Sequence, residues 1–147
     1  MTTFGFRYVD GPVDVREYPE GSGTQTFKTG DPVELDAGAV VVASDDQGIW
    51  GIAMQDASGT ATTKIRVAII NPSQIWCAIA DAQTLQAQEG LKYGLNLSAG
   101  NCTIDIGDTT TVTVVVQQLD PADGPATSLG KMWVRFLPAV CLSIVGE

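Results

Sequence analysis

The side chains of this chain that could do chemistry are carboxylates and thiols, because the sequence contains no histidine. Two pairs of carboxylates stand close together, Asp45 with Asp46 and Asp105 with Asp108. A carboxyl acts as a general acid where burial raises its pKa, whereas acids in polar turns usually stay solvated. Oxygen-rich turns can chelate calcium, but neither pair has the ligand spacing of a known calcium loop. We therefore predict neither catalysis nor a metal site at these pairs.

The three cysteines, Cys77, Cys102 and Cys141, have no Cys-x-x-Cys spacing. Cys77 and Cys141 lie in apolar runs, where a free cysteine behaves as a small buried hydrophobe. Without histidine, Ser-His-Asp catalysis, Cys-His catalysis and a Cys/His zinc set are all incomplete. We predict reduced structural thiols, no cofactor and no enzymatic activity.

The charge is acidic and uneven along the chain. Seventeen Asp and Glu residues face eight Lys and Arg residues, which gives a net charge of −9, and residues 1–60 hold most of the excess. Proteins that bind nucleic acids neutralise phosphates with clustered Lys and Arg, and the cations here are scattered. No apolar run approaches the roughly 20 residues of a membrane span, and the first residues lack the layout of a signal peptide. We expect a protein made in the cytoplasm that binds neither nucleic acid directly nor membranes.

The order of apolar runs and turns predicts an all-β fold, a small β-barrel or β-sandwich-like domain with at most one short helix. Sixteen glycines and seven prolines separate short runs rich in valine, isoleucine and threonine. Lys64 and Arg66 alternate with Ile65 and Val67, which predicts one solvated face and one buried face. Residues 109–119 are dense in β-branched side chains, so this strand should be central or covered by a subunit. The expected strands are residues 24–28, 32–35, 39–43, 49–54, 62–70, 75–80, 91–97, 102–106, 109–119, 132–136 and 139–145, and the expected helix is residues 81–90.

The first residues differ from this core. Phe4, Phe6 and Tyr8 alternate with other residues, as in a short strand with its aromatic rings on one side. Residues 19–23, Pro-Glu-Gly-Ser-Gly, are typical of a flexible joint. We expect an extended N-terminal arm and linker at residues 1–23 and a β-rich core domain at residues 24–147. The alternative is an ordinary first strand that folds back on its own barrel.

One stretch resembles a known family. Gly30-Asp31-Pro32-Val33 is followed by an apolar run, then by Gly51-Ile52-Ala53, with Asp56-Ala57 close behind. This order is similar to that of tailed-phage capsid decoration proteins, the head-stabilising cement proteins. The resemblance implies a structural virion protein on the capsid exterior, whose partner is the major capsid protein and which forms homotrimers at three-fold positions. Residues 91–147 do not align with the family pattern.

Under this hypothesis the N-terminal arm binds the capsid. Phe4, Phe6 and Tyr8 would fill pockets of the capsid protein, while acidic residues would meet basic residues at their rim. Those acidic residues are Asp10, Asp14, Glu17 and Glu20. Two other functions stay open: a phage tail or head–tail completion protein, which would favour rings of six, and a carbohydrate-binding β-sandwich in which Trp50 or Trp133 stacks on sugar rings.

Overall fold

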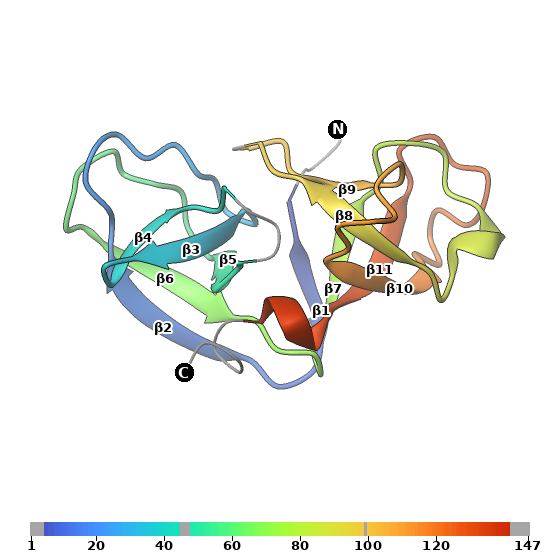
Figure 1. Ribbon diagram of the computed structural model, residues 1–147, viewed down its shortest axis with the longest axis horizontal. Helices are drawn as coiled ribbons and strands as arrows, with labels where there is room; N and C mark the ends of the chain where they lie inside the picture. Colours follow the sequence, from blue (N-terminus) through green and yellow to red (C-terminus); the bar gives the residue numbers. More distant parts are fainter. Residues whose placement is uncertain (1–4, 45–47, 99, 142–147) are drawn as a thin grey trace.

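A computed structural model describes residues 5–44, 48–98 and 100–141, and it is all-β as predicted (Figure 1). Two antiparallel sheets lie side by side along the long axis of the molecule. One sheet has the order β2-β6-β5-β3-β4, and the other has the order β1-β7-β11-β10-β8-β9. The strands are β1 Arg7–Asp10, β2 Asp14–Pro19, β3 Pro32–Asp36, β4 Ala39–Val42, β5 Gly51–Ala53, β6 Lys64–Ile69, β7 Ile75–Ile79, β8 Lys92–Asn96, β9 Thr103–Asp105, β10 Val114–Leu119 and β11 Lys131–Phe136.

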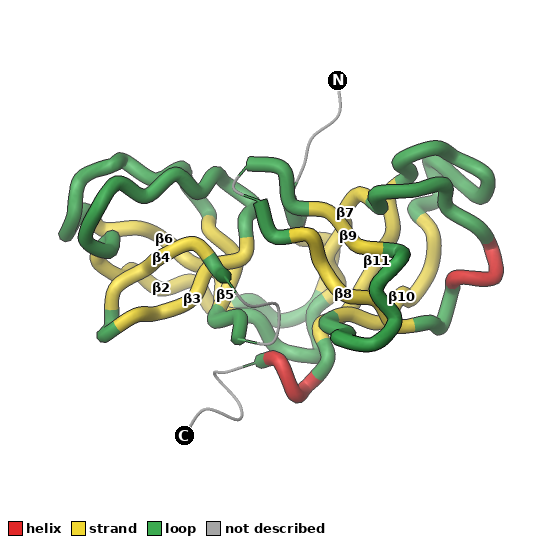
Figure 2. Tube along the Cα trace, turned by 45° about the horizontal axis from the view of Figure 1, so that its top comes forward, coloured by secondary structure: helices red, strands yellow, loops and turns green. Residues whose placement is uncertain are grey.

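Each sheet curls until its ends approach one another, so the chain forms two small barrels instead of one. In the first barrel, Glu20 beyond β2 forms a bridge with Val40 of β4. In the second barrel, Ala80 beyond β7 forms a bridge with Ile104 of β9. Curling of this kind shields the edge strands of small sheets. The tube in Figure 2 shows the same two groups of strands from another angle.

The alternation of side chains explains how the barrels fill. Lys64 and Arg66 are exposed while Ile65 and Val67 are buried, as the sequence predicts, and β6 is wholly buried from Val67 onward. The first barrel encloses a small apolar cluster around Phe27 and the β6 side chains. The second barrel encloses a larger cluster that also takes in residues of β5 and β6, so the two barrels share an apolar contact. Strand β10 is central, between β11 and β8, in agreement with its β-branched sequence.

The structure corrects the expected arm at residues 1–23. Strand β1 pairs with β7 in the second barrel, and β2 pairs with β6 in the first, so this segment belongs to both sheets. Phe6 is buried, with its ring 5.1 Å from that of Phe136. The error arose at residues 19–23, whose composition indicates a flexible joint although Glu20 and Gly21 are buried, and at the preceding strand β2, whose residues 14–17 are all exposed. An edge strand that projects from its barrel exposes both faces, which removes the usual alternation. Phe4 lies outside the described residues.

Three other expectations differ from the structure. Residues 24–28 form a loop instead of a strand, although Phe27 in it is buried in the first core. The expected helix at residues 81–90 shortens to a 3-10 turn, η1 Gln86–Gln88, and a second turn, η2 Pro138–Val140, occupies the start of the expected last strand. Residues 142–145 of that strand lie outside the described part.

The chain crosses between the barrels twice, and Gln74 joins the two crossings. Its Nε2 donates hydrogen bonds to the carbonyl oxygens of Pro12 and Ile69, both at 2.9 Å. Its Oε1 accepts from Trp76 Nε1 at 3.0 Å and from the Asn71 amide at 3.1 Å. Gln74 is fully buried, and all four hydrogen-bonding positions of its carboxamide are used.

Gly11 lets the two crossings come together. Its φ of 101° lies in the left-handed region that favours glycine. A Cβ at this position would stand 2.6 Å from the carbonyl oxygen of Ser73. A larger residue would therefore push apart the two segments that Gln74 holds.

Replacing Gln74 with leucine should destabilise the whole chain, because two carbonyl oxygens and two N–H groups would lose their partner. Each buried group left unsatisfied costs about 1–3 kcal/mol, so we expect a loss of at least about 3 kcal/mol. Urea unfolding followed by tryptophan fluorescence measures this loss. The exposed Gln83, changed to leucine, is the matched control. Similar midpoints for both variants would contradict the role given to Gln74.

Candidate functional site

The residues that carry the family resemblance meet in space and form a second junction between the barrels. The Gly30 amide donates to the carbonyl oxygen of Ala53 at 2.8 Å, and the Ala53 amide donates to that of Asp31 at 2.9 Å. On its other side, Gly30 accepts a hydrogen bond from the Phe6 amide at 2.7 Å, next to β1. Gly30 has a φ of 96°, and a Cβ there would lie 3.0 Å from the Phe6 carbonyl oxygen. The turn at residues 28–31 thus ties the first barrel to a strand of the second.

Asp31 extends this junction to the loop between β8 and β9. One carboxylate oxygen, Oδ2, accepts from the Lys28 amide at 2.9 Å and from the Gly100 amide at 2.7 Å. The residue is only 2% exposed, and burial raises its pKa above the ordinary value although both amides oppose the shift. Asp56 supports the same turn by accepting from the amide and hydroxyl of Thr29, and these bonds lower its pKa. These two acids act as fixed acceptors for the turn.

The carboxylate pairs of the sequence serve the backbone locally. Asp108 accepts hydrogen bonds from the amides of Thr111 and Thr110, which lower its pKa. Asp105 accepts from the Gly107 amide, while desolvation, with Asp81 and Asp108 nearby, raises its pKa. Asp45 and Asp46 lie outside the described residues. Within the described part, no group of three or more His, Cys, Asp or Glu residues could hold a metal ion.

The three thiols are free and buried. Desolvation raises the pKa of Cys77 and that of Cys141 to about 11 each, and it also raises the pKa of Cys102. The thiolate is the nucleophilic form, so these side chains are poor nucleophiles near neutral pH.

The residues expected to contact the capsid divide into two groups. Tyr8, Asp10 and Asp14 are exposed, as that role requires, whereas Phe6 belongs to the core. Glu20, which we expected at the rim, is 1% exposed. Its carboxylate accepts hydrogen bonds from Ser58 and from the Gly59 amide at 2.8–2.9 Å, so it fixes the loop before β6. Glu20 and Phe6 are therefore structural residues.

The exposed residues lie along one continuous edge that spans both barrels, which we call the acidic edge. Strands β1 and β2 each stand at the end of their sheet, and they follow one another in the chain (Figure 1). Large apolar side chains are exposed along it, Tyr8 at 41%, Val13 at 45% and Val15 at 44%. Exposed carboxylates alternate with them along the chain, and Arg16 of β2 is also exposed and pairs with Asp14 at 2.9 Å. The acidic edge consists of Tyr8, Asp10, Val13, Asp14, Val15 and Glu17.

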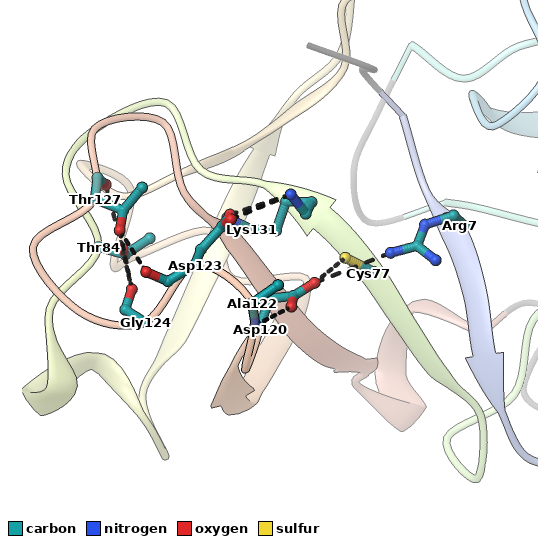
Figure 3. A network of polar contacts seen from close by, with 9 residues as sticks. All are labelled: Arg7, Cys77, Thr84, Asp120, Ala122, Asp123, Gly124, Thr127 and Lys131. Atoms are coloured by element: carbon teal, nitrogen blue, oxygen red, sulfur yellow. Dashed lines mark hydrogen bonds and ion pairs between the residues drawn. The ribbon is translucent and has the colours of Figure 1, made fainter. Parts of the chain in front are cut away.

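A groove of about 640 Å³ lies between the barrels on the side of β1. Its walls are residues 5–8 at the start of β1, the turn at residues 29–30, residues 53–54 at the end of β5, residues 76–79 of β7, and Leu129 with Lys131. Figure 3 shows Arg7 and Lys131 on either side of Cys77, each near a carboxylate of the loop that precedes β11. No local sequence pattern indicates the groove, since its walls come from segments far apart in the chain.

The tryptophans take three different environments. Trp76 is buried in the second core, while Trp50 and Trp133 are half-buried. Trp50 Nε1 donates to the hydroxyl of Tyr18 at 3.1 Å, and the two rings meet edge to face beside a smaller cavity of about 330 Å³. Stacking of sugar rings on Trp50 or Trp133 stays a prediction.

Comparison with known proteins adds no relative. No family model, no curated protein and no solved structure matches the chain. In the part of the chain that the structure describes, no helix is long and apolar enough to cross a membrane.

The raised pKa of Asp31 predicts a pH-dependent effect of the Asp31→Asn substitution. Asparagine keeps an oxygen for both amides but has no charge to desolvate. Below the ordinary pKa of 3.8 the carboxyl is protonated in both states and resembles the amide. Above the raised pKa of the folded state, the folded wild type bears the cost of a buried charge. The stability of the variant relative to wild type should therefore increase as the pH rises from about 3 to about 7.

Urea midpoints across this pH range measure that difference. Asp10→Asn, at an exposed position of β1, is the control for removing one negative charge. A relative stability of Asp31→Asn that stays flat or falls as the pH rises would contradict the burial of an ionised group at this junction.

Proposed function

We propose that this chain is a structural virion protein that binds the outer surface of a phage capsid and stabilises the expanded head against the pressure of packaged DNA. The acidic edge carries the proposal. Exposed apolar side chains that lie among exposed charged side chains are typical of a surface that meets a protein partner. The partner that this chemistry fits is a capsid protein with an apolar patch rimmed by Lys and Arg.

The arrangement of the resemblance residues is a second support. Gly30, Asp31 and Ala53 are joined by backbone hydrogen bonds, and Asp56 holds the adjoining turn. The two halves of the motif lie apart in the sequence but form one structural unit. The motif therefore constrains the fold more than the same number of scattered matching residues would. It is consistent with a family that keeps this junction.

The proposed capsid contact is a folded surface instead of a flexible arm. Strands β1 and β2 are already paired with β7 and β6, so the edge offers a surface held in place by both barrels. Binding through such a surface avoids the entropic cost of ordering a flexible segment. Tyr8, Asp10 and Asp14 keep their proposed contact role on this surface.

Stabilisation of the head follows from mass action. A protein that binds the expanded shell and not the unexpanded one shifts the equilibrium toward expansion. If three copies associate, three modest contacts act together and gain avidity. The proposal therefore needs only moderate affinity from each acidic edge.

Replacing Val13 and Val15 together with serine should weaken binding to heads and leave the fold intact, because both side chains are largely exposed. Loss of their apolar contact should lower the affinity by about tenfold. The measurement is cosedimentation with expanded, undecorated heads of the phage whose genome encodes the chain.

The matched control is a double serine variant of Leu85 and Leu91, whose exposures of 47% and 49% are similar but which lie off the acidic edge. Equal binding by both double variants would contradict the acidic edge as the contact. Absence of the unaltered chain from the heads would contradict the proposed function itself.

The solution mass tests the trimer. Light scattering at low and high concentration should give about three times 15.4 kDa, because decoration at three-fold positions favours closed three-fold symmetry. A hexamer would instead favour the tail or head–tail completion protein. A monomer at all concentrations would restrict trimers to the assembled shell.

A further inference from the structure

The groove between the barrels has the size and position of a binding site. Its volume of about 640 Å³ lies within the range of about 300–1,000 Å³ that is usual for ligand sites. Such sites occur preferentially where two compact units meet, and both barrels contribute walls here. The groove does not include Val13 or Val15 of the acidic edge. A ligand can therefore bind in the groove whether or not the protein binds a capsid.

Exposed apolar side chains gather at this groove. Tyr8, Met54 and Leu129 are exposed by 41%, 36% and 46%, and they come from β1, the end of β5 and the loop before β11. Single exposed apolar residues are common, but three that converge on one concave site mark an interaction surface. Ala53, Ala78 and Ile79 also line the groove, whose surface is somewhat more apolar than polar.

Leu129 is held in an unfavourable backbone conformation at the rim. Its φ of 53° is rare for a residue with a large side chain, and such strain persists where surrounding contacts impose it. The contacts come from Thr84, whose amide and hydroxyl bind the Thr127 carbonyl oxygen and whose hydroxyl also reaches the Gly124 carbonyl oxygen (Figure 3). These hydrogen bonds hold the loop before β11 in place and keep Leu129 at the groove.

The charged side chains that line the groove are cations, although the chain is acidic. Its walls contain Arg7 and Lys131 and, among the described residues, no Asp or Glu. Lys131 Nζ lies 3.2 Å from Asp123, while Arg7 lies 4.0 Å from Asp120 and is exposed over 67% of its side chain. Asp120 is itself held by the Ala122 amide at 2.8 Å. The guanidinium of Arg7 therefore keeps most of its donors available for an anionic group.

Strand β1 supplies an unpaired backbone along the groove. Among the strands that the structure describes, it has a hydrogen-bonded neighbour on one side only, β7. The Phe6 amide is occupied by Gly30, and a bulge between Tyr8 and Asp10 interrupts the other end. The backbone groups of Tyr8 face the same side as those of Phe6, whereas those of Arg7 face β7, so an added segment can pair with β1 only at Tyr8. This length suits a short extended segment.

From these features we propose that the groove binds a short extended peptide in which an acidic residue stands beside a large apolar residue. The peptide backbone pairs with β1 at Tyr8. Its carboxylate binds the Arg7 guanidinium with Lys131 nearby, and its apolar side chain lies against Met54 and Leu129. The occupant is a segment of a partner protein, recognised by this combination of charge and apolar surface.

Panning of the immobilised full chain against a displayed random seven-residue peptide library tests the proposal. The enriched peptides should carry Asp or Glu within two positions of Leu, Ile, Val, Met or Phe. One enriched peptide, synthesised with blocked ends, should shift the backbone amide resonances of Arg7, Tyr8, Met54 and Leu129. Its amide counterpart, with Asn or Gln for the acid, should bind at least about fivefold more weakly.

Two substitutions in the groove, Arg7→Gln and Leu129→Gly, test binding separately from folding. Arg7→Gln should weaken the peptide at least about fivefold, whereas Arg66→Gln, at an exposed position of β6, should not. Leu129→Gly should also weaken the peptide while preserving or raising the urea midpoint, since glycine adopts this φ freely. A purely structural Leu129 would instead lose stability.

Three results would overturn the proposal. These are a library without enrichment, enriched peptides that lack an acid, and a synthetic peptide whose resonance shifts fall outside the groove. Shifts confined to the Tyr18–Trp50 cavity would assign the ligand to that site instead.

Discussion

The carboxamide of Gln74 is the contact on which the arrangement of the two barrels depends. It is buried between the segments that cross from one barrel to the other, and it binds both of them together with the indole of Trp76. A buried polar group that satisfies every neighbour fixes geometry more closely than apolar contact does, because a hydrogen bond has direction as well as distance. The junction at Gly30 and Asp31 adds a second fixed point. Two such points define how the barrels face one another, and therefore define the groove.

The two surfaces of interest differ in charge, although they share β1. The acidic edge presents carboxylates to solvent, whereas the groove presents Arg7 and Lys131 between apolar walls. Asp120 and Asp123 hold these cations without lining the groove themselves. Surfaces that carry side chains of opposite charge favour different partners, and each surface disfavours the partner of the other.

The local pattern of the sequence predicts the parts of the fold that repeat a simple period. Alternation at β6 leads to a correct strand with correct burial, and the β-branched run leads to the central strand β10, which begins at Val114 instead of at residue 109. Strand β2 escapes prediction because it exposes both faces, and the helix at residues 81–90 is overestimated because propensity alone supports it. The family motif is visible as sequence, but its role as a junction depends on contacts with Phe6 and Gly100 that no local pattern records. The groove could not be predicted for the same reason. Arg7 and Lys131 line the same groove only because β7 pairs with β1 on one side and with β11 on the other.

The order of strands along the chain has a consequence for synthesis. All five strands of the first barrel lie between β1 and β7, so this barrel is an insertion within the second one. It can close as soon as β6 has emerged, because all its strands lie between β2 and β6. Strand β1 is made before the first barrel but finds its partner only after β7 exists, and Phe6 reaches Phe136 only after β11 has emerged. Because contacts between distant residues form slowly, the nascent protein passes through a stage with one finished barrel and an unpaired leading strand.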